Sequence, residues 1–175
     1  MSINHWIVKN LVCTLLLAVG GLNMYAQKDK YLIEAEAFQF KGKWSTDRSA
    51  DCMGSAMLRL NGGGSLDEQF DALTVVNIME EGDYNVWVRS ADYDKLPGTR
   101  LFRLSVDEKP MKESGKHGKV GFYWENAGCV QLAKKQVLLR LHDTKRNFGR
   151  CDAILLVKDH SINPNEMDRK EVGKW

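Results

Sequence analysis

The sequence lacks the charge excess that marks nucleic-acid-binding and membrane-surface proteins. Its 25 lysines and arginines stand against 23 aspartates and glutamates, which leaves a net charge of only +2. Such a chain exerts no strong long-range attraction on a polyanion, so we expect no nucleic-acid partner, and any recognition of charge must be local. The 175 residues, 43% of them hydrophobic, suit one globular domain with its own core.

The common catalytic motifs are missing too. No GxSxG is present, the glycines of residues 61–64 are not followed by the Lys-Ser/Thr of a P-loop, and no CxxC or HxxxH pair occurs. Three of the four histidines, His117, His142 and His160, fall in a glycine-rich loop, on an outward strand face and in the tail, and His5 lies near the N-terminus. This scatter does not favour a nucleophilic triad, so we expect a protein that is not an enzyme.

The N-terminus has the order of a secretory signal. Lys9 precedes an apolar run over residues 11–22, and the sequence Asn-Met-Tyr-Ala-Gln follows it. The run is too short for a comfortable membrane span and no stop-transfer pattern follows. We therefore expect a signal peptide over residues 1–26, cleavage after Ala26, no stable membrane insertion, and a secreted or periplasmic protein.

Cysteine is scarce in the remainder of the chain. Cleavage would leave Cys52, Cys129 and Cys151. An odd number allows at most one internal disulfide in an oxidising compartment. Three buried thiols that behave as small apolar residues are about equally consistent with the sequence.

Alternation of apolar and polar residues predicts the fold class. In residues 84–89, Tyr84, Val86 and Val88 point one way while Asn85, Trp87 and Arg89 point the other, which is typical of a strand with one buried face. We expect an all-β antiparallel sandwich or jelly roll over residues 27–158, followed by a polar tail or linker over residues 159–175. The expected strands are residues 31–37, 57–60, 71–79, 84–89, 101–106, 122–125, 129–132, 136–142 and 151–157.

Two carboxylates share one face of the first expected strand. Glu34 and Glu36 could act as an acid and base, ligate calcium, or form a solvated edge-strand face that discourages aggregation. Calcium prefers several oxygen ligands, and Asp152 could supply another if the last strand lies beside the first.

Aromatic and basic residues suggest two binding surfaces. One is the loops, since planar side chains that stack on sugar rings are often presented there, although each ring could equally cap the core. The loop-associated aromatics are Trp44, Tyr93, Tyr123, Trp124 and Phe148. The other is a band on outward strand positions that could pair with uronic-acid carboxylates or be merely solvated. Its members are Trp87, Arg89, Arg103, Arg140 and His142.

Four short motifs carry a family resemblance: residues 34–36 (Glu-Ala-Glu), residues 82–89, Trp124-Glu125, and residues 149–154 (Gly-Arg-Cys-Asp-Ala-Ile). Over about residues 31–157 the chain resembles the galactose-binding-like β-sandwich modules of secreted bacterial polysaccharide-degrading proteins. It is similar to the carbohydrate-binding modules of xanthan lyases and golvesin-like proteins. A similar module stands at the N-terminus of some secreted FAD-dependent oxidoreductases.

The resemblance implies a site and a function. It implies a structural calcium held by Glu34, Glu36 and Asp152, and sugar contacts from Trp44, Tyr93, Tyr123 and Asn147. Asp92 and Tyr93, where the central strand enters its loop, become the stronger candidates, with Trp87 and Arg89 kept for a ligand on the sheet face. Arg150-Cys151-Asp152 stands where related modules have an Asn-Asp pair. We expect a non-catalytic module that binds a polysaccharide or oligosaccharide; the alternative is a structural or protein-interaction module of a larger polysaccharide-processing enzyme.

Overall fold

The structure, a computed structural model, describes residues 29–61, 68–144 and 148–175. The expected signal peptide, the glycines at 62–64 and Asn147 lie outside these ranges. The elements are β1 (Lys30–Glu34), η1 (Ala35–Ala37), β2 (Trp44–Arg48), β3 (Ala56–Leu60), η2 (Glu68–Phe70), β4 (Ala72–Asn77), β5 (Gly82–Ala91), β6 (Phe102–Val106), β7 (Lys109–Ser114), β8 (Phe122–Leu132), β9 (Gln136–Asp143), β10 (Arg150–Val157), η3 (Pro164–Glu166) and α2 (Arg169–Val172).

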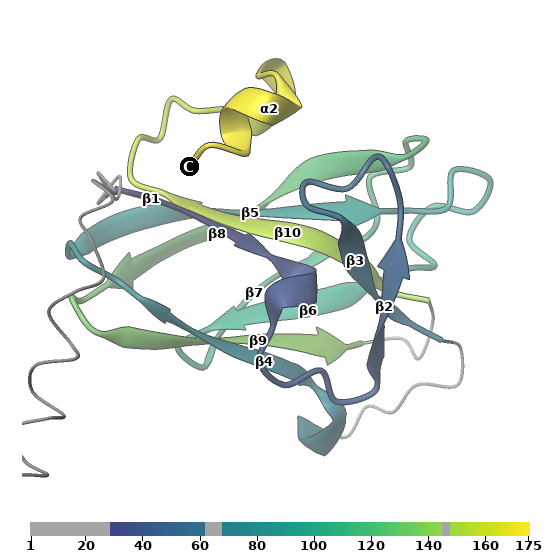
Figure 1. The fold of residues 1–175 in the computed structure, drawn as a ribbon, viewed down its shortest axis with the longest axis horizontal. Coiled ribbons are helices and arrows are strands. Elements are labelled where there is room, and N and C mark those ends of the chain that lie inside the picture. The colour runs from purple at the N-terminus through teal and green to yellow at the C-terminus, as the bar shows by residue number, and fades with distance from the viewer. Residues whose placement is uncertain (1–28, 62–67, 145–147) are drawn as a thin grey trace, which may run out of the picture.

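These strands form two antiparallel sheets that face each other (Figure 1). The six-stranded sheet has the order β2-β3-β10-β5-β8, and β1 pairs with β10, so the first strand lies beside the last. The four-stranded sheet has the order β4-β9-β6-β7. The expectation of an all-β antiparallel sandwich is confirmed.

The core lies between the two sheets and follows the alternation in the sequence. In β5, Tyr84, Val86 and Val88 are fully buried, while the residues between them face outward. Leu104 and Val106 of β6 are fully buried on the opposing sheet and belong to the same apolar cluster. Strands with a two-residue period thus close one core between two inner faces.

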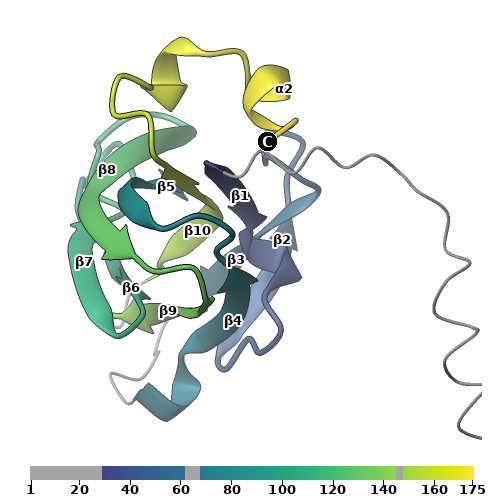
Figure 2. The ribbon, with the colours of Figure 1, turned by 90° about the vertical axis from the view of Figure 1, so that its left-hand side faces the viewer.

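A second apolar cluster lies on the outer face of the six-stranded sheet. Leu155 and Val157 of β10 and Trp124 of β8 are buried there together with Val172 of α2. Residues 158–175, the C-terminal segment, therefore run back across this face (Figure 2). The sequence predicted a polar tail or linker because only a few apolar residues are spread among its charges. Those residues, Ile162, Met167, Val172 and Trp175, are the ones that pack on the sheet.

Three other segments differ from the expected elements. The first strand ends at Glu34, and Glu36 belongs to a 3-10 turn. Trp44 begins a strand although polar residues surround it. Residues 112–114, which lie outside the expected strands, belong to β7, where Met111 is the buried apolar residue.

The described cysteines, Cys52, Cys129 and Cys151, are all free, and Cys52 and Cys151 are buried. No disulfide therefore joins the described cysteines, and the buried-thiol interpretation holds for Cys52 and Cys151 but not for Cys129, which is exposed. Within the same ranges, no helix is long and apolar enough to span a bilayer.

Candidate functional site

Four connections meet at one end of the sandwich, the loop end. They join β2 to β3, β5 to β6, β7 to β8 and β9 to β10, and the β5–β6 and β7–β8 connections lie together on the right in Figure 1. Asp92, buried at the end of β5, organises two of them. Its carboxylate accepts hydrogen bonds from the backbone N–H groups of Tyr93 (2.7 Å), Gly98 (3.2 Å) and Gly118 (2.9 Å). Charge-assisted bonds of this kind are strong, so this carboxylate joins the β5–β6 connection to the β7–β8 connection.

Glu125 of β8 holds the second of these connections from the other side. Its carboxylate accepts hydrogen bonds from Gly115 N (2.6 Å) and Lys116 N (3.2 Å), and from Ser90 Oγ (2.6 Å). Gly115 has φ of +86°, and a Cβ there would stand only 2.0 Å from the carbonyl oxygen of Arg100. Only glycine fits this backbone, and the glycine-rich stretch is therefore a shaped loop.

The loop end contains a hollow of about 410 Å³, the loop-end hollow, lined by Tyr93, Leu96, Thr99, Arg100, Phe148 and Arg150. The side chains of Tyr93 and Phe148 are 40% and 52% exposed, which is unusual for aromatic residues. The volume of the loop-end hollow falls within the range of roughly 300–1,000 Å³ that is typical of small-molecule binding sites. An adjoining hollow, lined in part by Ser49, Asp94 and Val120, shares Tyr93 and both arginines.

The two arginines occupy an unfavourable electrostatic environment. Burial lowers the pKa of Arg150, and the charges of Arg100 and Arg59 lower it further, with Asp47 acting in the opposite sense. Burial also lowers the pKa of Arg100, which the charge of Asp92 opposes. Arg100 Nη1 donates to the carbonyl oxygen of Asp92 (2.6 Å), and its guanidinium lies 5.3 Å from the Tyr93 ring. Arg100 is thus held in place beside an exposed ring.

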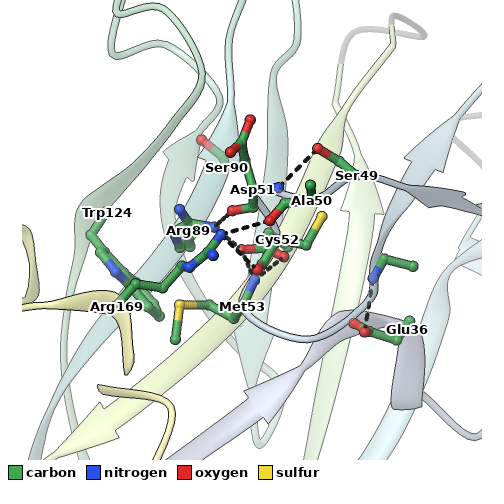
Figure 3. Close-up of polar contacts among 12 residues, drawn as sticks. Glu36, Ser49, Ala50, Asp51, Cys52, Met53, Arg89, Ser90, Trp124 and Arg169 are labelled. Carbon is green, nitrogen blue, oxygen red and sulfur yellow. Dashed lines mark hydrogen bonds and ion pairs between the residues drawn. The ribbon is translucent and has the colours of Figure 1, made fainter. Parts of the chain in front are cut away.

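Arg89, a candidate for the sheet face, lies instead in an internal network (Figure 3). Its Nη1 pairs with Asp152 Oδ2 and donates to the carbonyl oxygen of Asp51 (2.9 Å), and its guanidinium lies over the Phe122 ring. Met53 N also donates to the Asp152 carboxylate (3.1 Å). A β-bulge between Cys151 and Ala153 gives Asp152 this fully buried position, because a bulge redirects the side chain at the irregularity.

Glu34 and Glu36 do meet, although they do not share a strand face. A Cβ on Gly54 would lie 2.5 Å from Glu34 Oε2 and 2.5 Å from Glu36 Oε1, so glycine leaves room between the two carboxylates. Glu36 Oε1 accepts from Ser55 N (2.9 Å), while Oε2 is buried and has no hydrogen-bond partner among the described atoms. Burial, then the charge of Glu36 and then that of Asp152 raise the pKa of Glu34.

These observations fit a calcium site in part. Two crowded carboxylates, one with an orphaned buried oxygen, suit a hard cation. However, the carboxylate of Asp152 is held by Arg89 and Met53. No group of three or more His, Cys, Asp or Glu in the described part of the chain is arranged to hold a metal as the side chains stand.

The structure brings few of the other candidate ligand residues to the loop end. Trp44 is 4% exposed and packs edge-on against Phe102 (5.7 Å), so it belongs to the core. Trp87 packs in the cluster beneath the C-terminal segment. The ring of Tyr123 lies tilted against that of His117 (centroids 5.6 Å apart), and Tyr123 lines a smaller hollow next to the C-terminal segment.

The expected basic band is divided between the two sheets. Arg103 lies opposite His142 in the four-stranded sheet, whereas Trp87 and Arg89 belong to the six-stranded sheet. His142 Nδ1 bonds to the buried carboxylate of Asp71 (2.9 Å). Four residues of the loop-end hollow were not among the candidates from the sequence: Leu96, Thr99, Arg100 and Arg150. Their convergence depends on how the β5–β6 connection lies relative to the start of β10.

The arrangement of the two antiparallel sheets is similar to the fold of carbohydrate-binding modules of families 35 and 6, which are galactose-binding-like β-sandwiches. A family 35 module from Clostridium thermocellum is 18% identical, with a TM-score of 0.58, and the match covers 73% of this chain and 98% of that one. The C-terminal CBM6 of LamC, a laminarinase from Zobellia galactanivorans, is 15% identical, with a TM-score of 0.57 and coverage of 74% and 100%.

A larger protein contains the same fold. The Podospora anserina GH26-CBM35 β-(1,4)-mannanase is 18% identical, with a TM-score of 0.60; the match covers 79% of this chain but only 30% of the mannanase. At these identities the likeness establishes the fold. No protein-family model matches the sequence, and a comparison with curated proteins gives no match.

Proposed function

We propose that this chain is a secreted, non-catalytic module that binds a polysaccharide or oligosaccharide in the loop-end hollow. The observation that carries the proposal is the pair of exposed rings, Tyr93 and Phe148, on two different connections of one hollow. The C–H faces of sugar rings are apolar and suit aromatic stacking, while the hydroxyl groups at their edges need polar partners. The hollow provides the rings together with Thr99 and two guanidinium groups.

The geometry also argues against a site on the outer face of the six-stranded sheet. The C-terminal segment occupies this face, and Asn165 accepts from Trp124 N (2.9 Å) and donates to its carbonyl oxygen (2.9 Å). A glycan would have to displace this segment to reach Trp87, whereas Tyr93 and Phe148 are open to solvent.

Affinity electrophoresis in gels with and without soluble polysaccharides tests the proposal. Tyr93→Ala and Phe148→Ala should each weaken retention about 5- to 30-fold, which corresponds to about 1–2 kcal/mol for a central aromatic contact. Phe40→Ala is the matched control, because Phe40 is as exposed as Phe148, at 52%, forms a bridge with Leu73 of β4, and lines neither hollow of the loop end. A wild-type protein that no polysaccharide retains, or equal losses in the Phe40 variant, would reject the proposal.

We further propose that Glu34 and Glu36, with Asp152 close by, hold a structural calcium ion. The crowded glutamates and the orphaned Glu36 Oε2 support it. The ion would neutralise the carboxylates and so stabilise the β1 edge. Calcium at 100 times its Kd should stabilise the wild type by about 2.7 kcal/mol, and Glu36→Gln should lose the effect. Glu171→Gln, an exposed glutamate in α2, is the control; equal unfolding curves with calcium and with chelator would remove the ion from the proposal.

The alternative is a structural or protein-interaction module of a larger polysaccharide-processing enzyme. The low coverage of the Podospora mannanase favours it, since there the fold makes up a minor part of an enzyme. In that case the Tyr93 and Phe148 variants would retain full function in the assembled enzyme, while the isolated chain would bind no glycan.

A further inference from the structure

Two guanidinium groups in the loop-end hollow have no carboxylate partner. Arg100 comes from the β5–β6 connection and Arg150 begins β10, yet both line the same hollow. None of the ion pairs among the described residues involves either of them. The Nε atom of Arg150 is also buried, and it has no hydrogen-bond partner among the described atoms.

Most carboxylates near these two arginines already have other hydrogen-bond or ion-pair partners. Asp47 pairs with Arg59 at 2.9 Å, and Asp92 accepts from three backbone N–H groups. Asp94 and Asp51 are exposed and line the adjoining hollow, not the loop-end hollow. The lining of the hollow with the two exposed rings therefore includes two arginines and no carboxylate, and the charges of Asp92 and Asp94 act on Arg100 from outside that lining.

This arrangement is costly in the free protein. Like charges that are partly removed from water repel each other, and the lowered pKa of both arginines reflects that burial. A bound anion would compensate both groups, and guanidinium forks match the oxygen pairs of carboxylates and sulfates. The Tyr93 ring beside Arg100 and the Phe148 ring near Arg150 would flank the sugar that carries the anion.

We propose that Arg100 and Arg150 select glycans with a negatively charged group, either a uronic-acid carboxylate or a sulfate ester. The inference rests on the proposed glycan binding and adds its specificity. The positive charge is local, because the whole chain carries a net charge of only +2.

Matched polymer pairs test the selection. Polygalacturonate is compared with its fully methyl-esterified form, and dextran sulfate with dextran, so that each pair shares one polymer backbone and only one member carries negative charge. Wild-type protein should bind the charged member of at least one pair tenfold or more tightly, and this preference should decrease as salt increases. A preference confined to the first pair identifies the carboxylate; one confined to the second identifies the sulfate ester.

Variants assign the preference to the hollow. Arg150→Met should lose at least tenfold more affinity for the charged polymer than for its neutral partner, whereas Arg150→Lys should retain part of the preference. Arg103→Met is the control, because it removes one arginine from the four-stranded sheet, where Arg103 contacts Glu113 at 3.4 Å. Thermal unfolding verifies that each variant is folded.

The outcomes separate the two proposals. If Tyr93→Ala abolishes retention but charge makes no difference, the selection is overturned and glycan binding stands. Equal losses in the Arg103 and Arg150 variants also overturn it, because net charge would then explain the preference. If no polymer binds, the proposal of glycan binding is rejected. The anion site is then tested with D-glucuronate or sulfate alone, either of which should raise the unfolding temperature of the wild-type protein but not that of Arg150→Met. Absence of that increase overturns it.

Discussion

Aromatic rings and arginines come together in two regions of this molecule, the outer face of the six-stranded sheet and the loop end. On the sheet face, Trp87 and Trp124 lie beneath the C-terminal segment, and Arg89 is paired with Asp152. At the loop end, Tyr93 and Phe148 are exposed and their neighbouring arginines have no ion pair in the described ranges. The same residue types therefore pack inside the chain in one region and remain open in the other.

The difference follows from what the chain can place over each region. A sheet face is flat and regular, so a returning segment can cover it, and Arg169 fastens this one by donating to the carbonyl oxygens of Ala50 (2.9 Å) and Cys52 (3.2 Å). Loops at the end of a sandwich have no further element above them. Loop residues there can be held in position by hydrogen bonds to groups such as the carboxylates of Asp92 and Glu125, and they remain exposed.

The largest expected effect concerns the covered face. Val172→Asp places a carboxylate at a fully buried position, and should lower the free energy of unfolding by about 3 kcal/mol or more. Urea denaturation measures it. Lys174→Asp introduces the same group at an exposed position two residues later, and should change stability by less than about 0.5 kcal/mol. Similar values for the two variants would mean that the segment does not cover the face in solution.

The next effect concerns the loop end. Asp92→Ala leaves the N–H groups of Tyr93, Gly98 and Gly118 without their acceptor, and should cost about 2 kcal/mol and most of the glycan affinity. Asp92→Asn keeps one acceptor oxygen and should recover part of both. Urea denaturation and affinity electrophoresis give the two values. Unchanged retention by Asp92→Ala would show that the loops hold their shape without this carboxylate.

A smaller effect on stability, measured together with glycan retention, tests which of the two regions binds the glycan. Trp87→Phe should cost only about 1 kcal/mol, since the packing lost is partly offset by removal of the buried Nε1–H, which has no described partner. Glycan retention should match that of the wild type. A clear loss of retention would place the ligand on the sheet face after all.

The smallest effect is a pH dependence at the β1 edge of the covered sheet. Because the pKa of Glu34 is raised above its ordinary value of 4.5, the folded protein binds this proton more readily than the unfolded chain. In chelator, its contribution to the free energy of unfolding should therefore fall as pH rises from 4.5 through the raised pKa. Solvent screening limits the effect to about a few tenths of a kcal/mol.

Glu34→Gln measures this contribution. In chelator the variant should be slightly more stable than the wild type at pH 7, and with calcium it should be less stable if the ion binds there. Urea denaturation between pH 4 and pH 8 compares the two proteins. A wild type that gains stability over this range through Glu34 would contradict the crowding of the two glutamates.

The fold could be predicted because its central strands alternate cleanly. Tyr84, Val86 and Val88 indicate the buried face of β5, and the alternating apolar residues of β6 indicate a buried face in the other sheet. The C-terminal segment could not be predicted, since its few apolar residues, such as Val172, follow no regular period. Trp44 was misleading for a similar reason: its sequence neighbours are polar, and only the pairing of β2 with β3 brings it into the core.

The candidate site was predictable only in part. Tyr93 could be identified because it directly follows a strand in a polar stretch. The meeting of Arg100 with Arg150 could not, because it requires that β10 lie in the six-stranded sheet while β6 lies in the other. Glu34 and Glu36 were expected to meet on a strand face, yet they meet through a 3-10 turn and the space left by Gly54.

The central position of β10 also decides when this protein can fold. This strand pairs with β1, β3 and β5, and it follows all three of them in the sequence. Until β10 is in place, the strands that it joins lack their common neighbour and the larger sheet cannot assemble. Folding dominated by such distant pairings is slow, because long loops must close before the contacts between the strands can stabilise the sheet.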